Sequence, residues 1–211
     1  MNKMKIAFFE TELWEEDYLK SQLKSFDLLF FKEKIDSNNL KKISDTNILS
    51  VFISSIIDKE IIEKLKDLKY ITTRSTGFDH IDLKTCHNKK ILVSNVPTYG
   101  ENTVAEHTFA LILALSRKIY PTLEKTKKGD FSLEGLRGFD LKDKALGVVG
   151  TGNIGCHVIR IAKGFDMKIL AYDIKKNLKF AKKIGFKYLP FEELLKNSDI
   201  ITLHLPYNKS T

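Results

Sequence analysis

Three closely spaced glycines, Gly150, Gly152 and Gly155, carry the clearest chemical signal in this sequence. They form a Gly-x-Gly-x-x-Gly pattern between an apolar segment at 145–149 and an apolar stretch at 154–164. A glycine turn that leads from a strand into a helix can bind a phosphate, because the first amide N–H groups of the helix are free and its dipole favours negative charge. Gly150 would permit the tight turn, Gly152 would let a phosphate approach the backbone, and Gly155 would let the helix pack closely on the strand.

An acidic residue follows this turn at a distance typical of dinucleotide sites. Asp173 ends the next apolar segment, 18 residues (173 − 155) after Gly155, close to the expected distance of about 20. Its carboxylate would accept hydrogen bonds from the ribose hydroxyls of an adenosine and would repel a 2′-phosphate, which predicts NAD rather than NADP. Lys175 and Lys176 lie just beyond and could weaken that preference. A chance glycine turn is the alternative, and the flanking strand–helix–strand pattern disfavours it.

The histidines that could act as acids or bases have simpler structural interpretations. Glu106 and His107 are neighbours on a predicted helix, so their side chains point in different directions and cannot act on one atom. We interpret them as packing or domain-contact residues. His80 lies in a predicted loop, as a loop-stabilising or solvated side chain. His204 lies in an apolar segment, where a buried histidine with satisfied hydrogen bonds is the common case.

The cysteines and the basic residues suggest no metal or disulfide chemistry. Cys86 and Cys156 lie far apart, and no zinc-like Cys/His spacing occurs, which predicts no metal site and a reducing, cytoplasmic setting. Cys156 begins a predicted helix, which could lower its pKa, but a small buried role is favoured. Arg74, at a strand end, could face an anion or form a structural ion pair, and the sequence leaves both open.

Charge and hydropathy narrow the classes of partner. The net charge is +8, and hydrophobic residues make up 43% of the 211 residues, enough for a folded core. Only four of the 35 basic residues are arginines, and the lysines are spread along the chain, which favours solvated surfaces over a nucleic-acid-binding face. The apolar run at 108–115 is too short to cross a bilayer, which takes about 20 residues. We therefore predict small-molecule partners, with no nucleic acid and no membrane.

Short apolar segments alternate with amphipathic stretches, which predicts an α/β protein built from parallel β–α–β units. The helix at 104–117 is apolar on much of its circumference, so we expect it to lie between domains or subunits. The polar stretch at 125–143 is typical of a loop that could contain a short helix. The expected strands are 5–9, 28–31, 48–53, 70–73, 91–95, 145–149, 167–172, 186–189 and 200–205, and the other expected helices are 13–23, 58–68, 82–87, 154–164, 178–184 and 191–196.

Four segments together make the chain resemble the D-isomer-specific 2-hydroxyacid dehydrogenase family, from about Ile71 onward. They are Arg-Ser-Thr-Gly-Phe-Asp-His-Ile-Asp at 74–82, Asn-Val-Pro-Thr-Tyr at 95–99 leading into Val-Ala-Glu-His at 104–107, the glycine pattern with Asp173, and Thr-Leu-His-Leu-Pro at 202–206. The resemblance implies a flavodoxin-like substrate domain at 1–98. Residues 99–211 would then hold an inter-domain helix and the N-terminal part of a doubly wound, NAD-binding Rossmann domain.

The resemblance also assigns roles to individual positions. The backbone amides of Thr76 and Gly77 match those that bind the substrate carboxylate, and Tyr99 matches a tyrosine of the substrate pocket in the D-lactate dehydrogenase branch. The positions that match cofactor contacts are Gly150, Gly152, Asn153, Ile154 and Gly155 at the phosphates, Asp173 at the ribose, and Leu205, Pro206 and Thr211 along the cofactor.

The implied activity is hydride transfer between NAD(H) and a small D-2-hydroxy acid or 2-keto acid, such as D-lactate or pyruvate, in a homodimer if the chain is full length. The family's catalytic Arg, Glu or Asp, and His all match positions after Thr211. Only 61 residues (211 − 150) follow Gly150, too few for the roughly six strands of a complete dinucleotide sheet. We therefore expect a truncated chain that is inactive alone. The alternatives are a phosphoglycerate or glycerate dehydrogenase, a non-catalytic NAD-binding regulatory or interaction protein, and a site completed by a second polypeptide.

Overall fold

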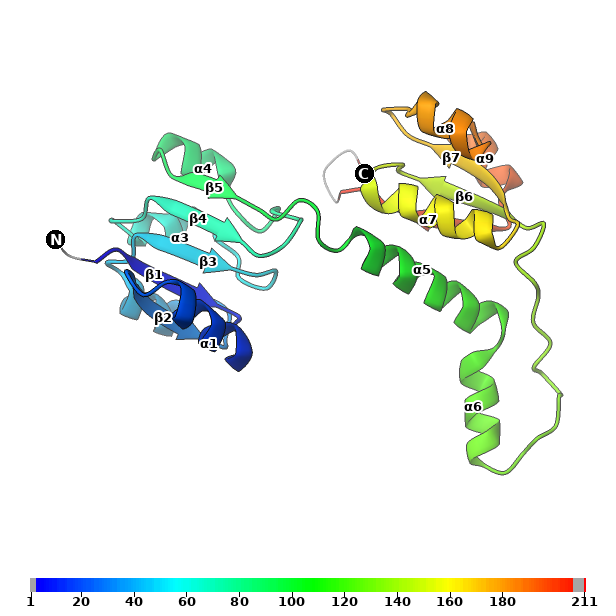
Figure 1. Ribbon diagram of the computed structural model, residues 1–211, viewed down its shortest axis with the longest axis horizontal. Coiled ribbons are helices and arrows are strands. Elements are labelled where there is room, and N and C mark those ends of the chain that lie inside the picture. The colour runs from blue at the N-terminus through cyan, green and yellow to red at the C-terminus, as the bar shows by residue number, and fades with distance from the viewer. Residues whose placement is uncertain (1–2, 207–210) are drawn as a thin grey trace. The chain divides into compact units, whose positions relative to one another are not determined.

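The protein divides into two compact units, Met1–Tyr99 and Gly100–Thr211. The computed structural model describes residues 3–206 and residue 211. Each unit has its own parallel sheet flanked by helices, as Figure 1 shows. The α/β class predicted from the alternating apolar pattern is therefore confirmed in both units.

The N-terminal unit holds a five-stranded parallel sheet in the order β2-β1-β3-β4-β5. This is the flavodoxin-like strand order, in which the order reverses between β1 and β3 and ligands bind beyond the carboxyl ends of the strands. The strands are β1 (Lys5–Phe9), β2 (Asp27–Phe31), β3 (Ile48–Val51), β4 (Tyr70–Thr73) and β5 (Leu92–Ser94).

Aliphatic and aromatic side chains from the middle strands form the core of this unit. Phe9, Leu49 and Ile71 are fully buried, and Leu49 lies directly beside Ile71 in the β3–β4 register. Asp58 and Asp82 accept hydrogen bonds from amides in the first turns of two helices that cover the sheet. The helices are α1 (Leu13–Gln22), α2 (Ser37–Leu40), α3 (Lys59–Lys64) and α4 (Leu83–Asn88), with a 3₁₀ turn at Lys41–Ile43.

The C-terminal unit holds a four-stranded parallel sheet in the order β8-β7-β6-β9. Counted within this unit the order is 3-2-1-4, which is the first part of the order 3-2-1-4-5-6 of dinucleotide-binding sheets. Its strands are β6 (Ala145–Val149), β7 (Lys168–Tyr172), β8 (Lys187–Tyr188) and β9 (Ile200–Leu203). Its helices are α5 (Glu101–Ser116), α6 (Ile119–Lys127), α7 (Asn153–Gly164), α8 (Leu178–Ile184) and α9 (Phe191–Asn197).

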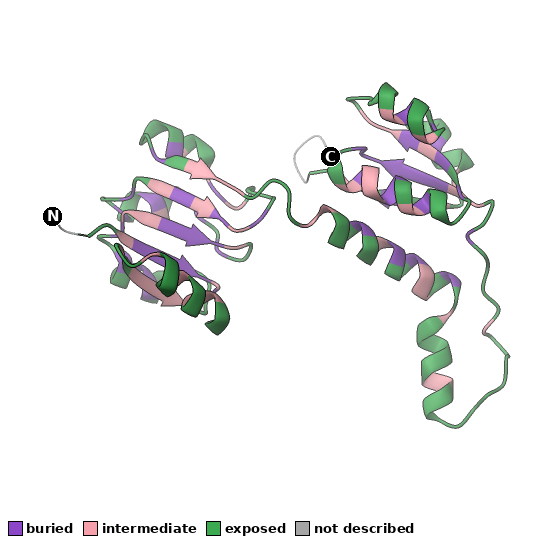
Figure 2. Ribbon diagram, in the orientation of Figure 1, coloured by how far each residue is buried: buried purple, intermediate pink, exposed green. Residues whose placement is uncertain are grey.

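Helix α5 packs along α7 and buries one stripe of its surface in the core of its own unit. Ala105, Phe109 and Ile112 lie in the cluster that also includes Leu146 of β6. Leu115, on another side of the helix, is 74% exposed. Figure 2 shows this division along α5, and it shows β6 buried along most of its length.

Several predicted element boundaries were wrong. Helix α6 (Ile119–Lys127) was not predicted, and only its last residues overlap the stretch at 125–143 that was predicted as a loop with room for a short helix. Helix α3 ends at Lys64 rather than at 68, since Leu65 leaves the helical conformation and turns into the core with Leu68. The short turns over residues 37–43 were not predicted, and β9 ends at Leu203 rather than at 205. Among the described residues, no helix is long and apolar enough to cross a membrane.

Candidate functional site

The turn between β6 and α7 requires glycine at two of its three glycine positions. Gly150 has a φ of +92°, and a Cβ there would overlap the carbonyl oxygen of His204. A Cβ on Gly155 would overlap the carbonyl oxygen of Gly150, so α7 could not pack against the turn. A Cβ on Gly152 would meet nothing within 4 Å. The packing of the chain therefore explains Gly150 and Gly155, whereas Gly152 borders open space.

The start of α7 presents amide groups without side-chain caps. Gly152 is the N-cap residue and makes no side-chain hydrogen bond. The amide N–H groups of Asn153 and Ile154 lie in the first turn of a 12-residue helix, where no intrahelical acceptor exists. The Asn153 side chain donates a 3.1 Å hydrogen bond to Glu101 at the start of α5. These groups form an anion-binding arrangement at the carboxyl end of β6.

Asp173 follows β7 and lies beside this turn. Its Oδ2 accepts hydrogen bonds from the Thr151 amide at 2.6 Å and the Thr151 hydroxyl at 3.0 Å, while Oδ1 accepts one from the Lys175 amide at 2.8 Å. Burial alone would raise the pKa of Asp173, but these donated hydrogen bonds outweigh burial and lower it. The carboxylate is therefore ionised and held in a fixed orientation beside the glycine turn.

Two residues of this arrangement, Thr151 and Tyr188, were missed by the sequence analysis. The Tyr188 hydroxyl lies 2.8 Å from the Thr151 hydroxyl and accepts a 3.0 Å hydrogen bond from the Asn177 amide. Thr151 could have been suspected, since it stands between two motif glycines. Tyr188 belongs to a two-residue strand, and no local pattern marks it.

The segment after β9 contains the remaining predicted cofactor residues. Leu205 is 43% exposed, and its side chain lies close to the position that a Gly150 Cβ would take. Thr211 is exposed and donates a hydrogen bond to the carbonyl of Pro206 at 2.5 Å. The structure thus brings Leu205 to the glycine turn, while Pro206 and Thr211 lie further along the chain.

The expectation that His204 is a satisfied core histidine was wrong. Its backbone amide extends the β9–β6 pairing with a 2.8 Å bond to Val149. Its Nε2 is buried and has no hydrogen-bond partner among the described residues. Burial lowers the pKa of the imidazole, which is therefore neutral at neutral pH.

The predicted substrate residues lie in the loop after β4, which its own side chains brace. The Thr76 hydroxyl donates to the carbonyl of Val96 at 3.0 Å, and Asn95 donates to the carbonyl of Thr76 at 2.7 Å. Within residues 3–206 and 211, the amide N–H groups of Thr76 and Gly77 form no hydrogen bond. Tyr99 is 56% exposed, and no contact in the described part of the chain brings it to them. A braced loop with two free amides can receive an anion such as a carboxylate.

Arg74 is a structural residue, which resolves the alternative that the sequence left open. Its guanidinium donates to the carbonyls of Phe9 and Glu10, both at 2.8 Å, and its Nε lies 3.4 Å from Glu15. Burial lowers the pKa of Arg74, against the opposing effect of Glu15. Arg74 therefore ties the carboxyl ends of β1 and β4 together and is not available to a ligand.

The other residues that could do chemistry have ordinary surroundings. His80 lies 3.2 Å from the Thr73 hydroxyl and braces its loop. Glu106 and His107 are both exposed on α5. Burial raises the pKa of the half-buried Cys156 thiol, so its position at a helix start does not activate it. No group of three or more potential metal ligands occurs in the described part of the chain.

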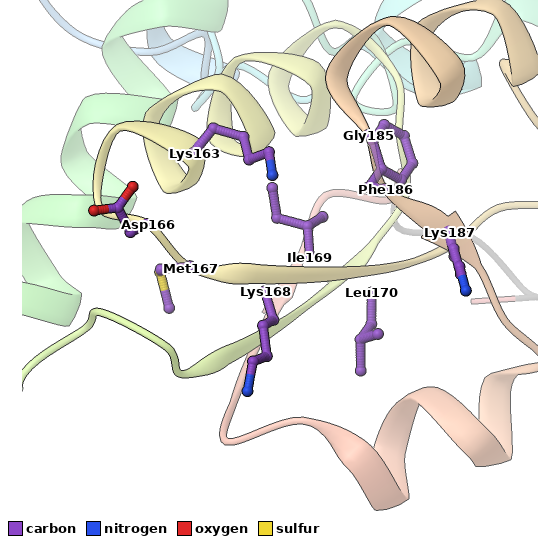
Figure 3. Close-up of a pocket in the computed structure, with 9 residues that line it drawn as sticks. All are labelled: Lys163, Asp166, Met167, Lys168, Ile169, Leu170, Gly185, Phe186 and Lys187. Atoms are coloured by element: carbon purple, nitrogen blue, oxygen red, sulfur yellow. The ribbon is translucent and has the colours of Figure 1, made fainter.

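A hollow of about 420 Å³ lies at the opposite end of the C-terminal sheet, where β7 begins. Figure 3 shows the Lys163 side chain on one side of β7 and the Lys168 side chain on the other. Lys163 and Lys168 therefore do not converge on one point of the hollow. It also lies away from the glycine turn and Asp173, which are at the carboxyl ends of the strands.

Comparisons with known proteins agree on one family. Residues 109–211 match the model of the D-isomer-specific 2-hydroxyacid dehydrogenase NAD-binding domain. A 2-hydroxyacid dehydrogenase homolog from Haemophilus influenzae is 37% identical over 96% of this chain and 62% of its own length. The D-lactate dehydrogenase of Escherichia coli is 34% identical over 96% of this chain and 63% of its own length.

Solved structures show the same likeness in three dimensions. A D-lactate dehydrogenase from Aquifex aeolicus, complexed with NAD and lactic acid, superposes with a TM-score of 0.91 at 36% identity. The match covers 97% of this chain and 62% of that chain. The present chain therefore spans less than two thirds of the length of each of these three relatives.

Proposed function

We propose that this chain, which belongs to the D-isomer-specific 2-hydroxyacid dehydrogenase family, provides the NAD-binding turn and the substrate-carboxylate loop of an oxidoreductase. The proposed reaction transfers hydride between NAD(H) and a small D-2-hydroxy acid or 2-keto acid, of the D-lactate and pyruvate kind. The observation that carries the proposal is the glycine turn with an ionised, oriented Asp173 beside it, at the carboxyl ends of neighbouring strands.

The residues present fit an NAD cofactor. Gly152 borders open space, as a turn that a pyrophosphate approaches should. The amides of Asn153 and Ile154 would hold the phosphates, and Asp173 would accept a ribose hydroxyl. Leu205, Pro206 and Thr211 are proposed to lie along the cofactor, as the family resemblance implies. When bound, NAD supplies the acceptor or donor of the hydride.

The substrate loop would act by binding and orienting one end of the substrate. The free amides of Thr76 and Gly77 would donate hydrogen bonds to the substrate carboxylate, and the braces from Asn95 and to Val96 keep those amides in place. We assign Tyr99 to the wall of the substrate pocket, on the family resemblance. These groups position the substrate and transfer no proton.

Turnover requires a cation and a proton donor, and we assign neither role to any of these 211 residues. A cation must polarise the carbonyl, and a proton donor with a pKa near neutrality must protonate the forming alkoxide. The neutral His204 and the loop-bracing His80 are structural residues in our assignment. The family's cation, acid and histidine match positions beyond Thr211. We therefore propose that this chain alone binds NADH without turnover.

Calorimetry of the 211-residue protein with NADH, followed by an absorbance assay with pyruvate and hydroxypyruvate, tests the proposal. We expect NADH to bind, NADPH to bind more weakly, and neither keto acid to be reduced. Absence of NADH binding would refute the assignment of the cofactor site. Reduction of a keto acid at ordinary enzyme rates would refute the proposal that this chain alone is inactive.

A second measurement separates the dehydrogenase from its alternatives. A protein that carries the full length of the relatives should reduce pyruvate with NADH if the D-lactate assignment is right. A strong preference for hydroxypyruvate would favour the phosphoglycerate or glycerate dehydrogenase alternative. NADH binding without any turnover would favour a regulatory protein.

We propose a second copy of the same chain as the protein partner. The helix pair α5–α6 and the following loop carry several exposed, large apolar side chains, as an interface would require. They are Leu111, Leu115, Tyr120, Leu123, Phe131 and Leu133. Sedimentation velocity of a protein that carries the full length of the relatives should give a dimer, and Leu115→Glu should shift it toward monomer. A monomeric wild type would contradict the proposal.

The cytoplasmic setting and the exclusion of nucleic acid remain predictions from composition.

A further inference from the structure

A chain of hydrogen bonds connects the start of α8 to the Asp173 carboxylate. The Asn177 amide lies 3.0 Å from the Tyr188 hydroxyl, which lies 2.8 Å from the Thr151 hydroxyl. Thr151 in turn lies 3.0 Å from Asp173 Oδ2. The chain joins the glycine turn, the end of β7, strand β8 and the first turn of α8.

The donors and acceptors in this chain can have only one direction. An ionised carboxylate only accepts, so the single hydroxyl proton of Thr151 points to Asp173. Thr151 must then accept the hydroxyl proton of Tyr188, and the Tyr188 oxygen accepts the Asn177 N–H. Hydrogen bonds aligned in this way polarise one another, and this chain ends on a negative charge.

The same bonds decide which carboxylate oxygen is free for a ligand. Each carboxylate oxygen offers about two acceptor positions. Among the described residues, Oδ2 already accepts from the amide and hydroxyl of Thr151, whereas Oδ1 accepts only from the Lys175 amide. One acceptor position therefore remains, on Oδ1.

We propose that Tyr188 is a positioning residue that sets the preference for NAD over NADP. Its hydroxyl would hold Asp173 with Oδ1 toward the adenosine ribose, and it would also hold the loop at 173–177 in place through the Asn177 amide. This inference rests on the proposed NAD site. The loop carries Lys175 and Lys176, the cations that could attract a 2′-phosphate. Without the Tyr188 hydroxyl, the Asn177 amide loses its acceptor and the lysines gain freedom to reach that phosphate.

The test is the ratio of NADH to NADPH affinity, measured by calorimetry for the wild type and Tyr188→Phe. The ring of Tyr188 packs edge-on against Phe186 at 5.3 Å, and phenylalanine keeps this contact. We expect NADH affinity to fall about five-fold, as for one lost hydrogen bond, with NADPH affinity unchanged or higher. Tyr172→Phe is the matched control, because Tyr172 packs on Phe191 of α9 and its hydroxyl has no hydrogen bond in the described residues.

Two further variants separate positioning from folding. Thr151→Val removes the hydroxyl at nearly constant shape and should reproduce the loss of NADH affinity, while NADPH affinity should stay unchanged because Tyr188 still accepts from the Asn177 amide. Thr151→Ser keeps the hydroxyl and should restore the wild-type ratio. Thermal denaturation of each variant shows whether its fold is kept.

The pH dependence of NADH binding is a further test, because a general structural role of Tyr188 would not change it. Protonation of Asp173 removes its charge and weakens the ribose contact. The polarised chain favours the ionised form, so its loss should raise the pKa of Asp173. On acidification, Tyr188→Phe should therefore lose NADH affinity at a higher pH than the wild type.

The possible failures are distinguishable. A wild type that does not bind NADH refutes the proposed function itself. A wild type that binds NADH, with an unchanged ratio and pH dependence in both Tyr188→Phe and Thr151→Val, refutes the role of Tyr188 alone. Equal losses for both cofactors, together with a lower melting temperature, would show a general structural role and also refute it.

Discussion

Gly150 and Gly152 are two residues apart, yet alanine substitution should affect stability at Gly150 and NADH binding at Gly152. An alanine at Gly152 would project into open space, so we expect Gly152→Ala to keep its melting temperature and to weaken NADH binding at least about ten-fold, a difference of about 1.4 kcal/mol. Gly150→Ala must adopt a left-handed φ and overlap His204, which should destabilise the unit by about 1–3 kcal/mol. Calorimetry and thermal denaturation measure the two effects. Undiminished NADH affinity in Gly152→Ala would contradict the phosphate site.

Residue types and spacing predicted the parts of the site that are local in sequence. The glycine turn follows from three glycines between a strand and a helix, and Asp173 follows from its distance along one β–α–β unit. Thr151 and Tyr188 meet across 37 residues of chain, so no local pattern could pair them. The buried Nε2 of His204, which has no hydrogen-bond partner in the described part of the chain, was also beyond prediction, because hydrogen bonding of a buried group depends on its neighbours in space.

At the scale of elements, Glu10 joins strand β1 to the loop after β3. It has a φ of 58°, and its carboxylate accepts hydrogen bonds from the amides of Phe52, Ser54 and Ser55 at 3.1, 2.8 and 3.1 Å. Burial would raise the pKa of Glu10, but the donors of Ser55, Ser54 and Phe52 outweigh it and lower the pKa. This stabilising contribution is therefore fully present above the ordinary pKa of about 4.5 and is lost as the pH falls through the lower folded-state value.

We expect Glu10→Gln to destabilise the N-terminal unit by about 1–2 kcal/mol at pH 7. The difference from the wild type should shrink as the pH falls below the ordinary pKa of Glu10. Urea denaturation between pH 3 and pH 7, followed by circular dichroism, measures both. Glu33→Gln changes an exposed carboxylate with no side-chain partner in the described residues and serves as control. A constant difference across this pH range would contradict the role of the Glu10 charge.

Helices with a clear start or end signal were predicted closely, whether or not they bury a residue: α1, which buries none, was predicted to within one residue of its end. Helix α8 was predicted with its observed bounds, since Asn177 caps it and Gly185 ends it in the left-handed conformation. Helix α6 begins after Lys118, which is in the left-handed conformation and forms no side-chain cap, so no cap signal marked its start. Helix α3 was predicted too long because Leu65 and Leu68 continue its apolar pattern while they pack as a turn. Apolar periodicity predicts which side chains are buried, and it does not predict the backbone conformation that places them there.

At the scale of the whole molecule, the two hydrophobic cores are separate. One cluster runs from Ala7 to Ile91 and the other from Ala105 to Phe186, with no residue in common. Leu49 and Leu146 are each fully buried in one of them. Because cooperative unfolding follows shared packing, we expect two unfolding transitions, one for each unit.

Replacing one leucine in each core tests this expectation. Leu49→Ala and Leu146→Ala should each cost about 2–5 kcal/mol in the unit that holds the residue and leave the other transition unchanged. The single tryptophan, Trp14, reports on the N-terminal unit, so its fluorescence should follow Leu49→Ala and not Leu146→Ala. NADH should raise only the transition that Leu146→Ala lowers, because the glycine turn and Asp173 lie in that unit. One transition that both substitutions shift equally would mean that the two cores unfold as a single cooperative body.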